Sequence, residues 1–252
     1  LAGDTANARP WLERAVETGR RSGYRRAAAL AHASLGDLLC DLDDFESGIA
    51  HYDQASHLAS AIPDAALGCY VLAARAEARR LVGDLASAGH DLDRARSLLA
   101  LSPTAYEQAL VAYVSGTIAR DAGRTAEAVP ALEQAAEAFA AMGARRDEAR
   151  SLIYGADAAR RAGSDGPAAR LQARAEAAIQ DLSGRASMDP HLRRIRDDAR
   201  LCPPRAGRRR IEAAVRPHLA PAAGGPAPRE AGARTHGVLA VCAFGPPRVT
   251  VS

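Results

Sequence analysis

The amino-acid sequence contains no lysine, and each of its 33 basic Lys/Arg positions is an arginine. Aromatic residues make up only 4% of the 252 residues, so a core must be built mostly from small aliphatic side chains. No stretch reaches 18 consecutive apolar residues, which excludes a transmembrane helix and argues against a membrane partner. The opening segment LAGDTANARPWLERAV has no basic stretch followed by an apolar run, so we expect no signal peptide.

Cysteine is also scarce, and its four positions form no CxxC pair. Cys40, Cys69, Cys202 and Cys242 lie far apart in the sequence. In a chain without an export signal, such cysteines are expected to be reduced thiols. We therefore expect a cytoplasmic protein.

The usual sequence motifs of catalysis are missing as well. There is no GxxxxGK phosphate loop, no HExxH zinc motif and no GxSxG nucleophile elbow. The 7 histidines are scattered, and His51 and His57 are spaced so that they lie on different faces of one expected helix. No cysteine has a neighbouring histidine that would mark a nucleophile. We therefore predict a protein that is not an enzyme, with no catalytic, metal-binding or cofactor-binding residues and no cofactor.

An internal repeat dominates the first 182 residues. Five windows align without a gap at a constant spacing of 40 residues, at 3–15, 43–55, 83–95, 123–135 and 163–175. Their last column is always alanine, an earlier column is alanine or glycine, and a third is mostly leucine or tyrosine. These columns hold Ala15, Ala55, Ala95, Ala135 and Ala175; Ala8, Gly48, Ala88, Ala128 and Ala168; and Leu12, Tyr52, Leu92, Leu132 and Gln172. Spacings of four and three residues place all three columns on one helical face.

The first column of the windows predicts a tight turn between two helices. It contains glycine or aspartate, which tolerate a left-handed backbone. Upstream of each turn lies another helical stretch, at 29–42, 68–82, 105–122 and 147–162. Helix-breaking residues recur at the same 40-residue spacing at the far end of each unit. At one of these ends, Ser102 is the predicted N-cap and Pro103 the first helical residue. Each unit is thus helix A, turn, helix B and loop, and neighbouring units bury each other's apolar faces.

These columns resemble the tetratricopeptide repeat, and DDFESGIAHYDQA is the closest copy. Gly36 and Gly116 match the helix A glycine of that family. The resemblance implies an all-α fold, an α-solenoid of tetratricopeptide-type hairpins, over residues 1–182. Its 40-residue period is similar to that of MalT-type bacterial regulators. The first unit lacks helix A, so we expect the chain to be part of a longer protein, and the fifth unit reads as a terminal, capping repeat.

By the same resemblance, a concave groove is lined by fixed positions of each helix A, which makes it the candidate binding site. The implied groove turns from acidic to basic along the array, and arginine with tyrosine is a common pair at interfaces. An ordinary solvated helix face with intrahelical ion pairs is the alternative interpretation. The candidate groove residues are Asp37, Asp41, Tyr70, Glu77, Arg80, Tyr113, Thr117, Arg120, Arg150, Asp157, Arg160 and Arg161, with Ala33 and Asp121 beside them.

The C-terminal quarter of the chain differs in charge and composition. Residues 1–182 hold 20 arginines against 25 acidic residues, whereas residues 183–252 hold 13 against 5. We predict a terminal helix within 183–202 and a flexible, basic Pro/Gly/Arg-rich linker over 203–236. The basic tail suggests either contact with a polyanion or simply a solvated linker.

The last segment, 237–252, reads as a short β-hairpin, with VLAVCAF and RVTVS as strands around Gly-Pro-Pro. It resembles the opening hairpin of the winged-helix DNA-binding domain in SARP-type bacterial transcriptional activators. The matching residues are Leu239, Val241, Phe244, Gly245, Pro246, Val249 and Val251. An unattached hydrophobic hairpin end is the alternative.

Together the two resemblances imply a non-catalytic repeat segment of a bacterial transcriptional regulator. Its partner would be a protein, a peptide or another domain of the same regulator, and DNA would be bound only through a C-terminal domain that residues 1–252 do not complete. The alternatives are a stand-alone tetratricopeptide scaffold or adaptor, and the regulatory array of a multidomain cyclase or kinase.

Overall fold

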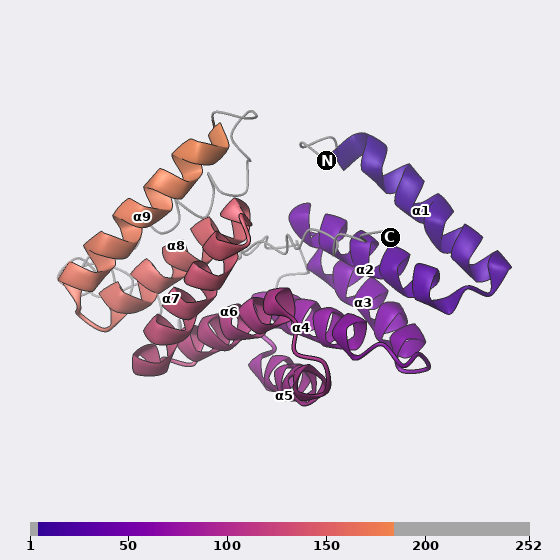
Figure 1. The fold of residues 1–252 in the computed structure, drawn as a ribbon, viewed down its shortest axis with the longest axis horizontal. Helices are drawn as coiled ribbons and strands as arrows, with labels where there is room; N and C mark the ends of the chain where they lie inside the picture. Colours follow the sequence, from indigo (N-terminus) through magenta and orange to yellow (C-terminus); the bar gives the residue numbers. More distant parts are fainter. Residues whose placement is uncertain (1–4, 184–252) are drawn as a thin grey trace, which may run out of the picture.

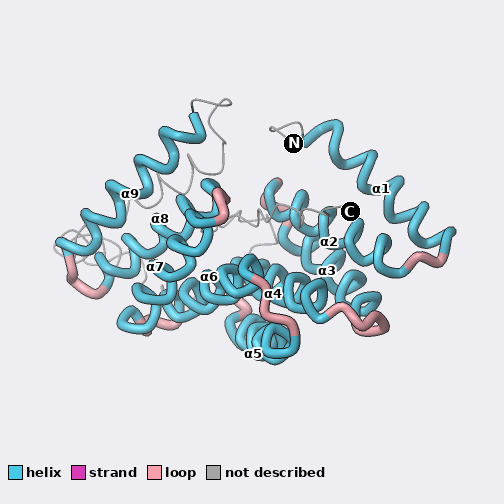
Figure 2. The backbone as a smooth tube through the Cα atoms, in the orientation of Figure 1, coloured by secondary structure: helices cyan, strands magenta, loops and turns pink. Residues whose placement is uncertain are grey.

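The computed structural model describes residues 5–183, which form helices and the short connections between them. This part of the chain contains nine helices and no strand, and Figure 2 shows the short loops that join the helices. The helices are α1 Thr5–Ser22, α2 Arg25–Asp41, α3 Phe45–Ala59, α4 Ala65–Leu81, α5 Leu85–Leu101, α6 Ala105–Asp121, α7 Thr125–Ala141, α8 Arg145–Arg161 and α9 Asp165–Ser183. The predicted all-α class is confirmed for these residues.

The helices follow the 40-residue period of the sequence. Helices α2, α4, α6 and α8 begin at residues 25, 65, 105 and 145, and their partners α3, α5, α7 and α9 begin at 45, 85, 125 and 165. Each even-numbered helix packs closely against the odd-numbered helix that follows it, as a hairpin. Helix α1 occupies the register of the second helix of such a hairpin.

The turn inside each hairpin has the predicted left-handed residue. Asp43 has a φ of 63° and Gly83 a φ of 87°. The residue after each of these is an aspartate that caps the next helix, since the Asp84 carboxylate accepts a hydrogen bond of 3.0 Å from the backbone N–H of Ser87. The Gly/Asp column of the sequence therefore does specify these turns.

Helix α6 begins at the start of the predicted stretch 105–122, but the predicted N-cap Ser102 is wrong. Ser102 is the C-cap of α5, and its backbone N–H donates to the carbonyl of Leu98 at 3.3 Å. Helix α6 begins at Ala105, with the extended residue Thr104 as its N-cap. The Thr104 hydroxyl donates to the carboxylate of Glu107 three residues later and caps no backbone N–H of the helix.

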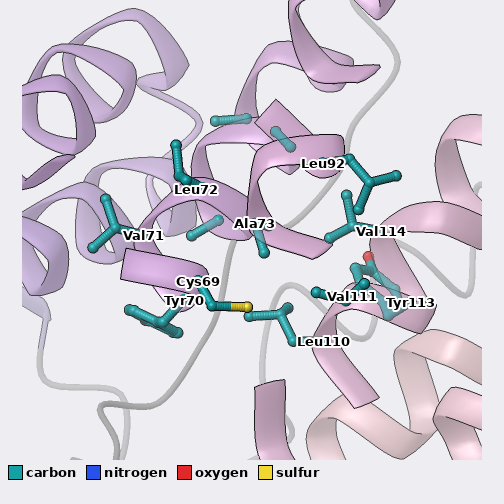
Figure 3. Packing of buried hydrophobic residues seen from close by; sticks show 14 of the residues in the cluster. Cys69, Tyr70, Val71, Leu72, Ala73, Leu92, Leu110, Val111, Tyr113 and Val114 are labelled. Carbon is teal, nitrogen blue, oxygen red and sulfur yellow. The ribbon is translucent and has the colours of Figure 1, made fainter. Parts of the chain in front are cut away.

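Figure 1 shows the nine helices of residues 5–183 as an arch with α1 at one end and α9 at the other. The even-numbered helices line its inner side, where α2 contacts α4, α4 contacts α6 and α6 contacts α8. The alanine columns of the repeat lie in the core between the helices, and Ala55, Ala95, Ala135 and Ala175 have no exposed surface. Figure 3 shows the centre of this core, where α4, α5 and α6 meet.

Among residues 5–183 no helix is long and apolar enough to cross a membrane. The predicted terminal helix, the linker and the C-terminal β-hairpin lie outside the described residues.

Candidate functional site on the inner helices

All twelve candidate groove residues lie on the inner helices α2, α4, α6 and α8. Most belong to two register columns, Asp37, Glu77, Thr117 and Asp157, and Arg80, Arg120 and Arg160. Nine of the twelve are buried, namely Asp37, Tyr70, Glu77, Arg80, Tyr113, Thr117, Arg120, Arg150 and Asp157. The other three, Asp41, Arg160 and Arg161, are half-buried. The structure therefore brings the candidates together in a buried network between helices, and their binding role stays a prediction.

Asp37 on α2 forms the first part of this network. Its carboxyl group accepts hydrogen bonds from the hydroxyl of Tyr52 on α3 at 2.7 Å and from the hydroxyl of Tyr70 on α4 at 2.6 Å. Burial raises the pKa of Asp37 to about 8, although the two tyrosine hydroxyls work in the opposite direction. At neutral pH this carboxyl group is therefore mostly protonated.

Glu77 on α4 forms the second part and is fully buried. It accepts hydrogen bonds from the hydroxyls of Tyr113 at 2.8 Å and Thr117 at 3.0 Å, both on α6. The guanidinium of Arg80 donates two more, at 2.8 and 2.9 Å. Burial works to raise the pKa of Glu77, but the charges of Arg80 and Arg150 and the hydrogen bonds outweigh it, and the pKa lies below its ordinary value. Glu77 is thus an ionised carboxylate in the interior.

A chain of ion pairs continues from Glu77 toward α8. Arg80 donates to Asp121, whose other oxygen accepts from Arg120 Nε at 2.8 Å. Arg120 also lies 3.5 Å from Asp157, and Arg161 Nε donates to Asp157 at 2.6 Å. Burial opposes the ionised form of Asp121, yet the two arginines lower its pKa. Each of these carboxylates therefore neutralises arginines from its own and neighbouring helices.

Aromatic rings cover the same arginines. The guanidinium of Arg120 lies 4.4 Å from the ring centre of Tyr154, and that of Arg150 lies 4.7 Å from the ring centre of Tyr113. Both distances fall within the range of cation–π attraction. Burial raises the pKa values of Tyr113 and Tyr154, so both phenols stay protonated at neutral pH.

A further ion pair joins distant parts of the inner side. Arg146 on α8 lies 3.4 Å from Asp41 on α2, across 105 residues of sequence. Near it, Arg150 lies 3.2 Å from Asp147, and burial raises the pKa of Asp147 despite the arginines beside it. Asp41 and Arg150, at opposite ends of the predicted charge gradient, are each paired with a neighbour of opposite charge.

Buried polar atoms of Tyr154 and Asp157 in this network have no hydrogen-bond partner among the described residues. They are the hydroxyl of Tyr154 and Oδ1 of Asp157. Buried polar groups are normally hydrogen-bonded, so such atoms call for an explanation. Both residues lie on α8 next to Arg120, and together they offer one hydrogen-bond donor and one acceptor.

The sequence analysis missed four members of the network, Tyr52, Arg146, Asp147 and Tyr154. Tyr52 carries the only hydroxyl in a column otherwise filled by leucine and glutamine, and this exception was a usable signal. Asp147 shares its acidic type only with its equivalent Glu107, and Tyr154 has no aromatic equivalent, so neither column carries a comparable signal. Their roles depend on how the inner helices approach one another.

Two of the scattered histidines also meet. The Nδ1 atoms of His32 on α2 and His51 on α3 lie 3.0 Å apart, so one ring donates to the other. Burial lowers the pKa of both rings. Within residues 5–183, however, no group of three or more His, Cys, Asp or Glu side chains could hold a metal ion.

No protein-family model matches the chain, and no curated protein is significantly similar to it.

Proposed function

We propose that residues 1–182 are a tetratricopeptide-type α-solenoid that serves as a non-catalytic binding segment of a bacterial transcriptional regulator. The 40-residue hairpin period and the small-residue columns support the repeat type. The MalT-like period and the SARP-like phrase LAVCAFGPPRVTV support the regulator. The partner is a protein, a peptide or another domain of the same regulator.

The observation that carries the binding role is the pair of unsatisfied atoms on α8. The Tyr154 hydroxyl is a donor and Asp157 Oδ1 is an acceptor, and both are buried beside the guanidinium of Arg120. A peptide group offers the complement, since its carbonyl accepts and its N–H donates. Both atoms lie below the accessible surface, so an extended segment at this end of the inner side pairs with them only if the side chains that cover them move.

The regulator part is tested by following the reading frame on both sides of the coding region and by measuring the intact mass of the expressed protein. We expect a phosphate-binding loop upstream and winged-helix segments after the RVTVS strand. An expressed protein limited to residues 1–252 would overturn the proposal that the chain is a segment of a regulator.

DNA binding gives a second test. The isolated 252-residue chain is expected to bind DNA only weakly, through its basic tail, without sequence preference and with a steep loss of affinity at higher salt. In gel-shift titrations, tight binding of the isolated chain to one operator sequence would contradict the proposal.

A stand-alone scaffold or adaptor is the second candidate. The observation that favours it is the exposed apolar face of α1, where Trp11 keeps 69% of its surface accessible. For a scaffold, we expect Tyr154→Phe and Asp157→Asn to change the affinity for a protein partner and to leave DNA binding unchanged.

A further inference from the structure

Helix α1 exposes a small-residue position that every other outer helix buries. Ala15 is exposed, whereas its register equivalents Ala55, Ala95, Ala135 and Ala175 have no accessible surface. Leu12 and Ala8 are only half-buried, although Leu132 and Ala128, in the same columns, are fully buried. The difference arises because each of the helices α3, α5, α7 and α9 packs against the inner helix that precedes it, and α1 has no such partner among the described residues.

Trp11 extends this exposed face. Its side chain is 69% exposed, with the guanidinium of Arg14 5.5 Å from the ring centre. Its register equivalent on α5 is Asp91, which is fully buried because Arg75 of the inner helix α4 covers it. On α9 the equivalent is Leu171, which is also fully buried. On α3 and α7 the equivalents His51 and Ala131 are half-buried. A helix that covered Leu12 and Ala15 would therefore cover at least part of Trp11.

The other hairpins define the chemistry of the missing cover. In α6–α7, Leu132 packs so closely on Gly116 that an added Cβ would lie 2.5 Å from the leucine Cγ. In α2–α3, the ring of Tyr52 leaves only 2.7 Å for a Cβ on Gly36. Leu12 is the equivalent of Leu132 and Tyr52, so the helix that covers it needs a small residue opposite.

We propose that the α1 face formed by Ala8, Trp11, Leu12 and Ala15 binds an α-helix of the inner type, which lies antiparallel to α1 and places a small residue opposite Leu12. The face repeats an interface that the structure contains four times, and the columns of those interfaces specify its occupant. This inference stands apart from the regulator proposal, because it depends only on the repeat register.

The chain itself supplies a suitable probe. Residues 1–4, Leu-Ala-Gly-Asp, align with residues 81–84, Leu-Val-Gly-Asp. A second copy of residues 65–80 fused directly before Leu1 of the full chain therefore places an α4 sequence in register with α1. Trp11 is the only tryptophan, and the fused copy adds none, so tryptophan fluorescence reports on this face alone.

In the fusion protein we expect the Trp11 emission to shift to shorter wavelength and its quenching by acrylamide to fall several-fold. A synthetic peptide of residues 65–82 added to the unfused chain should produce the same shift in a saturable way. Ala15→Glu should abolish both effects while leaving the unfused chain folded. Glu17→Arg should leave both effects intact, because its equivalents His57, Ser97 and Glu137 are exposed in the other units.

Two results would overturn the proposal. The first is that acrylamide quenches Trp11 equally in the fusion and in the unfused chain, while circular dichroism shows that the parent helices remain folded. The second is that the Trp11 emission of the unfused chain shifts to shorter wavelength as its concentration rises, while sedimentation shows an oligomer. The face would then serve self-association.

Discussion

Asp37 and Glu77 occupy the same register position on α2 and α4, yet burial affects them in opposite ways. Each is buried, and each accepts a hydrogen bond from a tyrosine of the following inner helix. The pKa of Asp37 rises to about 8, whereas that of Glu77 falls below its ordinary value. Three residues further along, α2 has Cys40 where α4 has Arg80. The presence of a guanidinium one turn away decides whether the buried carboxyl group is charged.

The same difference separates two regions of the inner side. Around α2 the network consists of neutral hydroxyl and carboxyl groups, with its arginine contact limited to Asp41 and Arg146. From α4 to α8 it consists of buried ion pairs. Neutral hydrogen bonds tolerate the loss of one partner better than buried ion pairs do, because a buried charge left without its partner is costly. The two regions should therefore respond differently to mutation and to pH.

The largest expected effect is that of Glu77→Gln. The amide retains the shape of the side chain but removes the charge that compensates Arg80, so we expect the free energy of unfolding to fall by about 3–5 kcal/mol. Urea denaturation at pH 7 measures this loss. Asp37→Asn is the matched control and should not lower the stability at pH 7, because the amide replaces a carboxyl group that is neutral in the folded chain but ionised in the unfolded chain. Equal losses in the two variants would break the comparison.

The pH dependence of stability gives the next largest effect. The pKa of Asp37 is about 8 in the folded chain and has its ordinary value of 3.8 in the unfolded chain. Its contribution is therefore complete below about pH 4 and is lost as the pH rises toward 8, at up to about 1.4 kcal/mol per pH unit. Asp37→Asn should make this slope shallower in denaturation curves recorded across that range, and the part that remains includes the contribution of Asp147, whose pKa is also raised by burial. Asp93→Asn, at an exposed position, should leave the slope unchanged. A slope that is as steep in Asp37→Asn as in the parent chain would mean that another group causes it.

The smallest effect compares two glycines of the C-terminal region. A Cβ at Gly116 would lie 2.5 Å from Leu132, whereas one at Gly155 would meet its neighbours at an ordinary 3.5 Å. Gly116→Ala should cost about 1–2 kcal/mol, since overpacking outweighs the gain in helix propensity. Gly155→Ala should gain up to about 1 kcal/mol from the lower flexibility of the unfolded chain. Thermal denaturation of the two variants checks both signs, and a stabilising Gly116→Ala would contradict the tight contact.

The repeat made most of the fold predictable, because one turn residue and a few small-residue columns recur in every unit. The predicted cap of α6 was wrong, because Ser102 ends α5 and the extended residue Thr104 precedes α6. The candidate site was predictable only as a set of helix positions. Its burial and its pairing between units depend on the curvature of the arch. Asp41 and Arg146, for example, meet across 105 residues, and no local pattern encodes that contact.

The most direct test of the account is a titration of the two carboxyl carbons by 13C NMR in the folded chain. The account predicts that the Asp37 signal titrates near pH 8, while the Glu77 signal stays that of an ionised carboxylate to well below its ordinary pKa of 4.5. Titration of both groups near pH 4, as in an unfolded chain, would contradict the claim that equivalent buried positions of this array carry opposite charge states.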